Sequence, residues 1–148
     1  MRLWKEIQAM PWALVVTPRC PTYIDVSAGI LADEDGRVLI TERLGEGPFQ
    51  GMWEFPGGKI ASGETAEAAL IRELQEEIGI DALEFAPFML LEHDYPDRSV
   101  RLHFFKVKKW QGEPIGIDGQ KLRWIMPAEI DPGCLLPADA PVIAKLLA

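Results

Sequence analysis

Cysteine is scarce in this 148-residue chain, which also lacks long apolar runs and an excess of basic charge. The two cysteines, Cys20 and Cys134, have neither metal-ligand spacing nor the number needed for a disulfide framework, so we expect a reduced, cytoplasmic protein. No segment approaches about 18 uninterrupted apolar residues, which argues against a membrane span. The net charge of −8 argues against a general nucleic-acid binder, because such proteins present a basic surface to phosphate groups.

The remaining composition is typical of one globular domain. Apolar residues make up 48% of the chain, and 148 residues are enough to bury a core. We divide the chain into an N-terminal extension, residues 1–22, and a domain, residues 23–148. Pro11 interrupts the apolar run of the extension, which disfavours a signal peptide. Packing of the extension against the domain and its use in a dimer contact both stay open, so we expect a monomer or a homodimer.

From Tyr23 onward the pattern of apolar residues predicts short strands around one long helix. Residues 24–30 alternate like a half-buried strand, and the acidic, glycine-containing segment 33–36 predicts a hairpin turn. The other predicted elements are strands at 37–42, at Trp53 and at 83–93, 100–107 and 122–125, a turn at 95–98, helices at 66–78 and 141–147, and a helical turn at 127–130. Because helices and strands do not alternate strictly, we predict an α/β (α+β) fold in which helices sandwich a mixed sheet.

The predicted helix at 66–78 carries an unusual set of glutamates. Thr65 is a suitable N-cap and Gly79 a suitable C-terminal residue. At about 100° per residue, the helix has one apolar stripe, formed by Ala66, Leu70, Leu74 and Ile78. Three carboxylates share an arc of about 100° that overlaps the edge of this stripe, namely those of Glu73, Glu76 and Glu77.

A glutamate-rich surface helix is the plain interpretation, but its charges would lie opposite the leucines. Carboxylates gathered at the border of a core repel one another and lose hydration, so they need a cation or strong hydrogen-bond donors. Carboxylate oxygens suit Mg²⁺ or Mn²⁺, which in turn suit phosphate substrates. Just before the helix, Gly57 and Gly58 could form a simple tight turn, with φ values that other residues avoid. Beside the glutamates, we expect the Gly57 carbonyl and the amides of this loop to face metal and phosphate.

Residues 58–80 resemble the Nudix box, which is a glycine, five residues, a glutamate, seven residues, and then Arg-Glu-apolar-x-Glu-Glu-x-Gly-apolar. All nine defined positions match, and the chance of such a match is on the order of 10⁻⁷. The matching residues are Gly58, Glu64, Arg72, Glu73, Leu74, Glu76, Glu77, Gly79 and Ile80. The similarity covers about residues 24–147 and, within the Nudix family, is greatest to the MutT-type 8-oxo-dGTP diphosphatases. It implies an α/β/α sandwich with the box helix on one face of a mixed sheet.

The resemblance implies metal-assisted hydrolysis of a nucleoside triphosphate to a monophosphate and pyrophosphate. The metal would be Mg²⁺, with Mn²⁺ as a possible substitute. The implied metal ligands are the carbonyl of Gly57 and the side chains of Glu73, Glu76, Glu77 and Asp118. The implied catalytic residues are Glu73, Glu76 and Arg72, of which Arg72 would orient Glu73, with Glu64 in support. Glu73 is the first candidate for general base and Asp118 the second.

The partner implied by the resemblance is a small nucleotide, with no nucleic acid and no membrane. Its pocket would be formed by Arg43, Glu54, Gly58, Lys59, Arg98 and Asp139. Arg43 stands where the family has an arginine that reaches the phosphates. Two positions depart from the MutT type, which carries an asparagine at the position of Asp139 and can offer a histidine at that of Pro48.

Asp139 leaves the identity of the base open. An ionised aspartate can only accept hydrogen bonds, which favours bases that present amino hydrogens, such as cytosine. A protonated aspartate could still donate to an oxo-purine if burial raised its pKa. We therefore expect a pyrophosphohydrolase that removes oxidised nucleotides such as 8-oxo-dGTP, with CTP or 5-substituted dCTP as the alternative substrate. A non-catalytic nucleotide-binding module is a lesser alternative, which the intact box disfavours.

Overall fold

The computed structural model describes residues 23–47 and 49–148, which contain seven strands, two α-helices and three 3₁₀ turns. The predictions made for residues 1–22 and for Pro48 lie outside the described residues. The strands are β1 (Tyr23–Leu31), β2 (Val38–Glu42), β3 (Trp53–Glu54), β4 (Gly57–Lys59), β5 (Asp81–Tyr95), β6 (Arg98–Gln111) and β7 (Leu122–Ile125). The helical elements are α2 (Ala66–Ile78), η2 (Pro127–Glu129), η3 (Pro132–Cys134), η4 (Pro137–Asp139) and α3 (Ala140–Leu147).

The strands form two sheets rather than one. A four-stranded sheet has the order β4-β1-β6-β5, and it is mixed because β1 runs parallel to β6 while its other pairs are antiparallel. A three-stranded antiparallel sheet has the order β3-β2-β7. The predicted mixed sheet is thus the four-stranded one. The division into two sheets was not predicted, because it depends on pairing between strands far apart in the chain.

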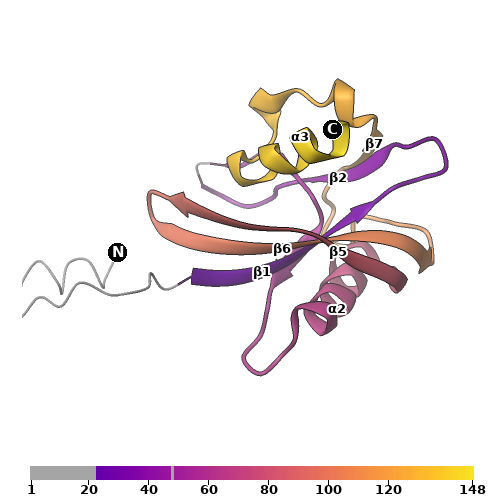
Figure 1. The fold of residues 1–148 in the computed structure, drawn as a ribbon, viewed down its shortest axis with the longest axis horizontal. Coiled ribbons are helices and arrows are strands. Elements are labelled where there is room, and N and C mark those ends of the chain that lie inside the picture. The colour runs from indigo at the N-terminus through magenta and orange to yellow at the C-terminus, as the bar shows by residue number, and fades with distance from the viewer. Residues whose placement is uncertain (1–22, 48) are drawn as a thin grey trace, which may run out of the picture.

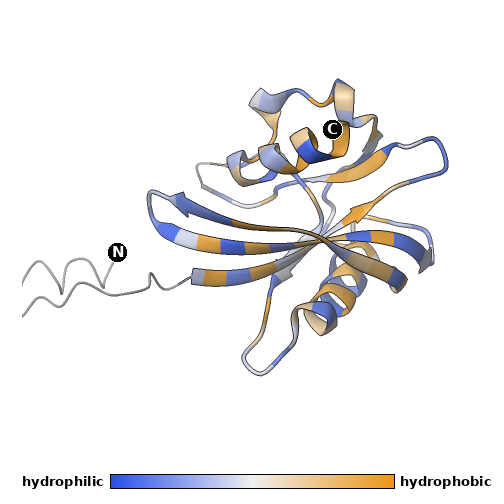
Figure 2. Cartoon of the chain, viewed as in Figure 1, coloured by the Kyte–Doolittle hydropathy of each residue, from blue (hydrophilic) through white to orange (hydrophobic). Residues whose placement is uncertain are grey.

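Helices cover both faces of the four-stranded sheet, as the predicted α/β/α sandwich requires. In Figure 1, α2 lies below this sheet, and α3 with the three-stranded sheet lies above it. Phe104 and Phe105, which are neighbours in β6, point to opposite faces and belong to different apolar clusters. Figure 2 shows apolar residues alternating with polar ones along other parts of β5 and β6. The core is therefore two apolar layers, one on each side of the sheet.

Helix α2 has the bounds that the sequence predicts. The side chain of Thr65 accepts a hydrogen bond from the backbone N–H of Ala68, and Gly79 closes the helix in the left-handed conformation at φ 71°. Of the predicted apolar stripe, Leu70, Leu74 and Ile78 have no exposed surface, and Ala66 is partly buried. This stripe packs the helix onto the sheet and fixes which side its glutamates face.

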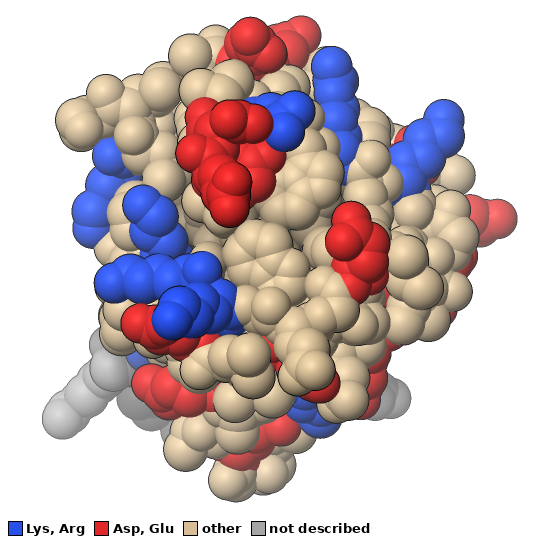
Figure 3. Space-filling view, turned by 90° about the vertical axis from the view of Figure 1, so that its right-hand side faces the viewer, with Lys and Arg blue, Asp and Glu red and all other residues tan. Residues whose placement is uncertain are grey.

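Strands β5 and β6 are longer than predicted and form one hairpin, with the predicted turn at its tip between Tyr95 and Arg98. None of the helices among the described residues is both long and apolar enough to span a membrane. On the face drawn in Figure 3, groups of lysine and arginine are interspersed with groups of aspartate and glutamate.

Candidate active site

The glycines before α2 permit two close approaches. Gly57 in β4 pairs with Ala28 in β1, and a Cβ at Gly57 would overlap the carbonyl of Ser27. A Cβ at Gly58 would overlap the carboxylate of Glu73. Neither glycine has a positive φ, so the conformational freedom that glycine permits is not used at these positions. Gly57 is needed because β4 lies so close to the backbone of β1, and Gly58 because β4 lies so close to the side chain of Glu73 from α2.

Glu77 joins the end of α2 to β4. Its Oε2 accepts a 2.9 Å hydrogen bond from the backbone N–H of Gly57. Burial, together with the charges of Glu54, Glu73 and Asp118, raises the pKa of Glu77 to about 7 against the opposing effect of the Gly57 N–H. A carboxyl in such surroundings would be stabilised in its ionised form by a cation.

Arg72 holds the neighbouring glutamates in place. Its Nη1 donates to Glu73 Oε1 at 2.8 Å and to Glu76 Oε2 at 3.2 Å. Its Nε and Nη2 each donate to the carboxylate of Glu64 at 2.8 Å, and Nη2 also donates to the Lys59 carbonyl at 3.0 Å. The Arg72 guanidinium lowers the pKa of Glu64 to about 2. Arg72 therefore orients Glu73 from behind, while Glu64 orients Arg72.

A cavity of about 390 Å³ lies in front of these groups. Its lining is rich in carboxylates, which belong to Glu42, Glu54, Glu73, Glu76, Glu77 and Asp118. Oxygen donors in this number suit a hard divalent cation. Across the described parts of the chain, no three acidic, histidine or cysteine side chains converge as a finished metal site. Since Arg72 takes one oxygen of Glu73 and one of Glu76, each of these carboxylates keeps its other oxygen for a cation.

A second cavity, of about 220 Å³, lies between the four-stranded sheet and η4. Its walls are mostly apolar, and they include Val26, Ala28, Val100, Leu102, Leu136 and Ala138. Both cavities are lined by Arg43, Glu54 and Gly57, so they adjoin. Arg43 Nη1 lies 3.2 Å from Glu54 Oε2 at this junction. The site thus combines a charged compartment with an apolar one, which suits a ligand that is ionic at one end and aromatic at the other.

Asp139 is buried at the apolar end, with 4% of its surface exposed. Its Oδ2 accepts a 3.1 Å hydrogen bond from the backbone N–H of Phe55. Burial, together with the charge of Glu54, raises the pKa of Asp139 to about 8 against the lowering effects of the Phe55 N–H and Arg43, so the protonated form predominates at pH 7. A protonated carboxyl can donate one hydrogen bond as well as accept, which removes the difference from an asparagine on which the cytosine interpretation depended.

The predicted site residues fall into two groups around these cavities. The carboxylate cavity is lined by Gly57, Glu73, Glu76, Glu77 and Asp118. The apolar cavity is lined by Arg43, Glu54, Gly58, Lys59, Arg98 and Asp139. Arg72 lines neither cavity, but it contacts Glu64, Glu73 and Glu76.

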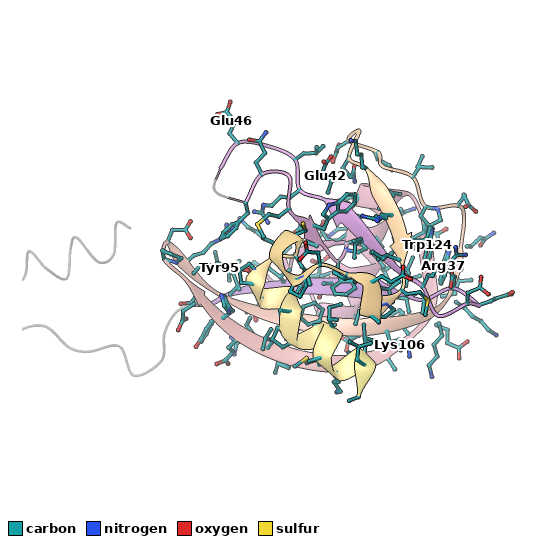
Figure 4. The ribbon with its side chains drawn as sticks, turned by 90° about the horizontal axis from the view of Figure 1, so that it is seen from above. Arg37, Glu42, Glu46, Tyr95, Lys106 and Trp124 are labelled. Atoms are coloured by element: carbon teal, nitrogen blue, oxygen red, sulfur yellow. The ribbon has the colours of Figure 1, made fainter. Side chains whose placement is uncertain are left out.

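Sequence reasoning missed an aromatic wall of the apolar cavity. The rings of Phe49 and Tyr95 meet edge to face with centroids 5.2 Å apart, and both line the cavity. The Tyr95 hydroxyl accepts a hydrogen bond from the backbone N–H of Ala138, which places Tyr95 beside η4 (Figure 4). Tyr95 is the first residue of the predicted turn at 95–98, but nothing in the sequence placed Phe49 next to it.

Comparison with known proteins identifies relatives over the same residues. Residues 23–146 match the family model described as NUDIX domain. An 8-oxo-dGTP diphosphatase of Escherichia coli (strain K12) is 42% identical over 123 residues, which are 83% of this chain and 95% of that protein. A CTP pyrophosphohydrolase of the same strain is 34% identical over 125 residues, 84% of this chain and 92% of that protein. A solved structure from work on MutT of Aliivibrio salmonicida and Vibrio cholerae has a TM-score of 0.70 and 35% identity, and covers 84% of this chain and 95% of that one.

Proposed function

Because this chain belongs to the NUDIX family, we propose that it hydrolyses a nucleoside triphosphate to a monophosphate and pyrophosphate, with 8-oxo-dGTP as its preferred substrate. The observation that carries this proposal is the pair of adjoining cavities. The carboxylate cavity suits a triphosphate with its cation, and the apolar cavity with Asp139 at its end suits a base. Relatives named 8-oxo-dGTP diphosphatase support the choice of substrate.

Mg²⁺, with Mn²⁺ as a substitute, is the cation that we propose for the carboxylate cavity. Its ligands would be the Gly57 carbonyl, Glu73, Glu76, Glu77 and Asp118. When bound, such a cation polarises phosphoryl oxygens and lowers the pKa of water. The donor set supports this assignment because it consists of oxygens alone, which Mg²⁺ and Mn²⁺ prefer.

The residues of the chain would share the reaction as follows. Arg43 would bind the phosphates of the substrate. It would leave its ion pair with Glu54 because the phosphates carry more negative charge than one carboxylate. Glu73 is our first candidate for the general base that accepts the proton of the attacking water, and Arg72 orients its carboxylate. A bond then forms between the water oxygen and phosphorus while a bridging P–O bond breaks, and pyrophosphate leaves. Asp118 is the second candidate for the base.

Hydrolysis of CTP or 5-substituted dCTP is the alternative, which the similarity to a CTP pyrophosphohydrolase supports. The state of Asp139 favours one substrate over the other. Cytosine offers an amino group to an ionised carboxylate, whereas 8-oxoguanine can accept from a protonated carboxyl. The raised pKa of Asp139 favours the oxidised purine.

The decisive experiment is a panel of nucleoside triphosphates assayed with Mg²⁺ at pH 7. The panel contains 8-oxo-dGTP, dGTP, dCTP, 5-methyl-dCTP and CTP, and pyrophosphate release gives kcat/KM for each. We expect the highest kcat/KM for 8-oxo-dGTP. A cytidine nucleotide in first place would favour the alternative, and no pyrophosphate from any member would reject hydrolysis of triphosphates altogether.

A further inference from the structure

Gln120 bridges the end of α2 to the loop that carries Asp118. Its side-chain Nε2 donates a 3.0 Å hydrogen bond to the backbone carbonyl of Glu77, and its Oε1 accepts a 3.0 Å hydrogen bond from the backbone N–H of Asp118. The side chain is buried, and it lines the carboxylate cavity together with Glu77 and Asp118. One amide therefore fixes the backbones of two residues that face the same cavity.

The last turn of α2 leaves carbonyls without partners inside the helix. The loop at 112–121 supplies those partners, since Ile115 N–H donates to the Ile78 carbonyl at 3.0 Å and Ile117 N–H donates to the Glu77 carbonyl at 3.3 Å. The Glu77 carbonyl thus accepts both from the backbone of Ile117 and from the amide of Gln120. The loop is attached to the helix directly behind the glutamates.

Asp118 stands in a tight turn of this loop. Gly119 N–H donates to the Gly116 carbonyl at 3.0 Å, and a Cβ at Gly116 would overlap the carbonyl of Gln120. The side chain of Asp118 is exposed, so surrounding side chains do not fix its position. Where its carboxylate lies relative to Glu77 depends on the backbone of the turn, and that backbone is tied to the helix by Gln120.

We propose that Gln120 is a positioning residue for the hydrolysis, because it fixes the backbone from which Asp118 extends its carboxylate into the carboxylate cavity, relative to Glu77. The inference extends the proposed function, in which Asp118 is a metal ligand and the second candidate base. The bridge needs a donor and an acceptor on one planar group of this length. Leucine at this position offers neither, and glutamate keeps the acceptor for Asp118 but loses the donor to Glu77.

A double-mutant cycle tests whether Gln120 acts through Asp118. The variants are Q120L, D118N and the double variant, with Q111L as a matched control at an exposed position of β6. We expect Q120L to lower kcat for 8-oxo-dGTP about tenfold, as loss of a residue that orients a metal ligand commonly does, with KM changed less than about twofold. In the D118N background, Q120L should lower kcat less than about twofold further, because the group that it positions is already gone.

If Q120L lowers kcat by the same factor in the wild type and in D118N, the proposal is overturned. Gln120 would then affect catalysis through the stability of the fold and not through Asp118. Thermal unfolding of each variant checks folding. Should Q120L not fold, Q120E replaces it in the same cycle with the same expected loss, because the donor to Glu77 is removed while volume is kept.

A second measurement does not depend on turnover. NMR of the metal-free protein follows the backbone amide resonance of Asp118, which reports the hydrogen bond to Gln120. Electron paramagnetic resonance, in a titration with Mn²⁺, measures the affinity for this ion. Q120L should shift the Asp118 amide upfield and weaken Mn²⁺ binding several-fold, but the loss of Mn²⁺ affinity should disappear in the D118N background. Unchanged values for both would reject the bridge. If the wild type hydrolyses no triphosphate, the proposed function fails, while these two readouts still decide whether Gln120 positions Asp118.

Discussion

The carboxylate of Glu73 occupies the space in which a Cβ of Gly58 would lie. Among the described residues, Glu73 is the only glutamate of the Nudix box whose side chain lies this close to the position of a glycine Cβ. On its other side, Arg72 Nη1 donates a 2.8 Å hydrogen bond to Glu73 Oε1. Its carboxylate is consequently confined between a strand backbone and a guanidinium, with 19% of the side chain exposed. A group confined in this way keeps a fixed direction toward the carboxylate cavity, as a metal ligand or general base needs.

Gly58→Ala should displace Glu73 without preventing the protein from folding. The added methyl group meets the end of a flexible side chain rather than backbone, so the chain should fold while Glu73 is displaced. We expect kcat with Mg²⁺ to fall by at least about tenfold, because displacement of a catalytic group by about 1 Å can cost up to about a hundredfold. Steady-state kinetics and thermal unfolding check both parts of this expectation.

The matched control for Gly58→Ala is Gly133→Ala in η3. Its new Cβ would meet the exposed side chain of Asp131 at 3.3 Å, and neither residue lines either cavity. This control should leave kcat unchanged. Normal kcat in Gly58→Ala would show that the confinement of Glu73 has no part in the reaction.

Glu76→Gln and Glu77→Gln test the proposed metal ligands. A neutral amide keeps the shape of the side chain but removes the charge that a divalent cation requires, so each change should lower kcat by roughly two to four orders of magnitude. Folding should be retained, since the amide oxygen introduced by Glu77→Gln can still accept from the Gly57 N–H. The control is Glu67→Gln, which makes the same change at an exposed position on the same helix. Activity near that of the wild type with Mg²⁺ would exclude the changed residue from the metal site.

The sequence predicts those parts of the structure that depend on local periodicity and capping. Thr65 and Gly79 bound α2 as expected, and the helical period alone places Glu73 and Glu77 beside the buried leucines. Phe49, Tyr95 and Gln120 could not be found in this way, because their roles arise from contacts with residues distant in the chain. The second sheet and the full length of β5 and β6 were not predicted for the same reason, because they depend on pairing between residues that are far apart in the sequence.

Asp139→Asn tests how the base is recognised, when its substrate preference is compared with that of the wild type at two pH values. At pH 7 the buried carboxyl is mostly protonated and can donate as an asparagine amide does, so the preference for 8-oxo-dGTP over dCTP should change less than about threefold. Above pH 8 the wild-type carboxyl ionises and loses its donor. The ratio of kcat/KM for the two nucleotides should therefore fall more steeply between pH 7 and pH 9 in the wild type than in Asp139→Asn, in which only the purine itself titrates. A ratio that follows the same course in both proteins would remove Asp139 from base recognition.

The buried Asp139 also makes the stability of the fold depend on pH in a direction opposite to that of most carboxylates. Its pKa rises from the usual 3.8 to about 8 on folding, so the folded state binds the proton more tightly than the unfolded state. Between about pH 4 and pH 8 the unfolded chain loses this proton while the folded chain retains it. The contribution of Asp139 to the free energy of unfolding is thus fully present below pH 4 and is lost as the pH rises to 8.

The variant Asp139→Asn has no titrating carboxyl at this position, which makes it the reference for this loss. Other groups titrate alike in the two proteins, so the difference between their free energies of unfolding isolates residue 139. We expect this difference to grow in favour of the variant by about 1–3 kcal/mol between pH 4 and pH 8. A rigid protein would give the full ~1.4 kcal/mol for each unit by which the pKa of Asp139 is raised. The expected change is smaller because the folded protein relaxes around the charge. Denaturant unfolding at several pH values measures it. A difference that stays constant from pH 4 to pH 8 would mean that Asp139 is ionised in the folded protein, and the donor on which recognition of an oxidised purine depends would be absent.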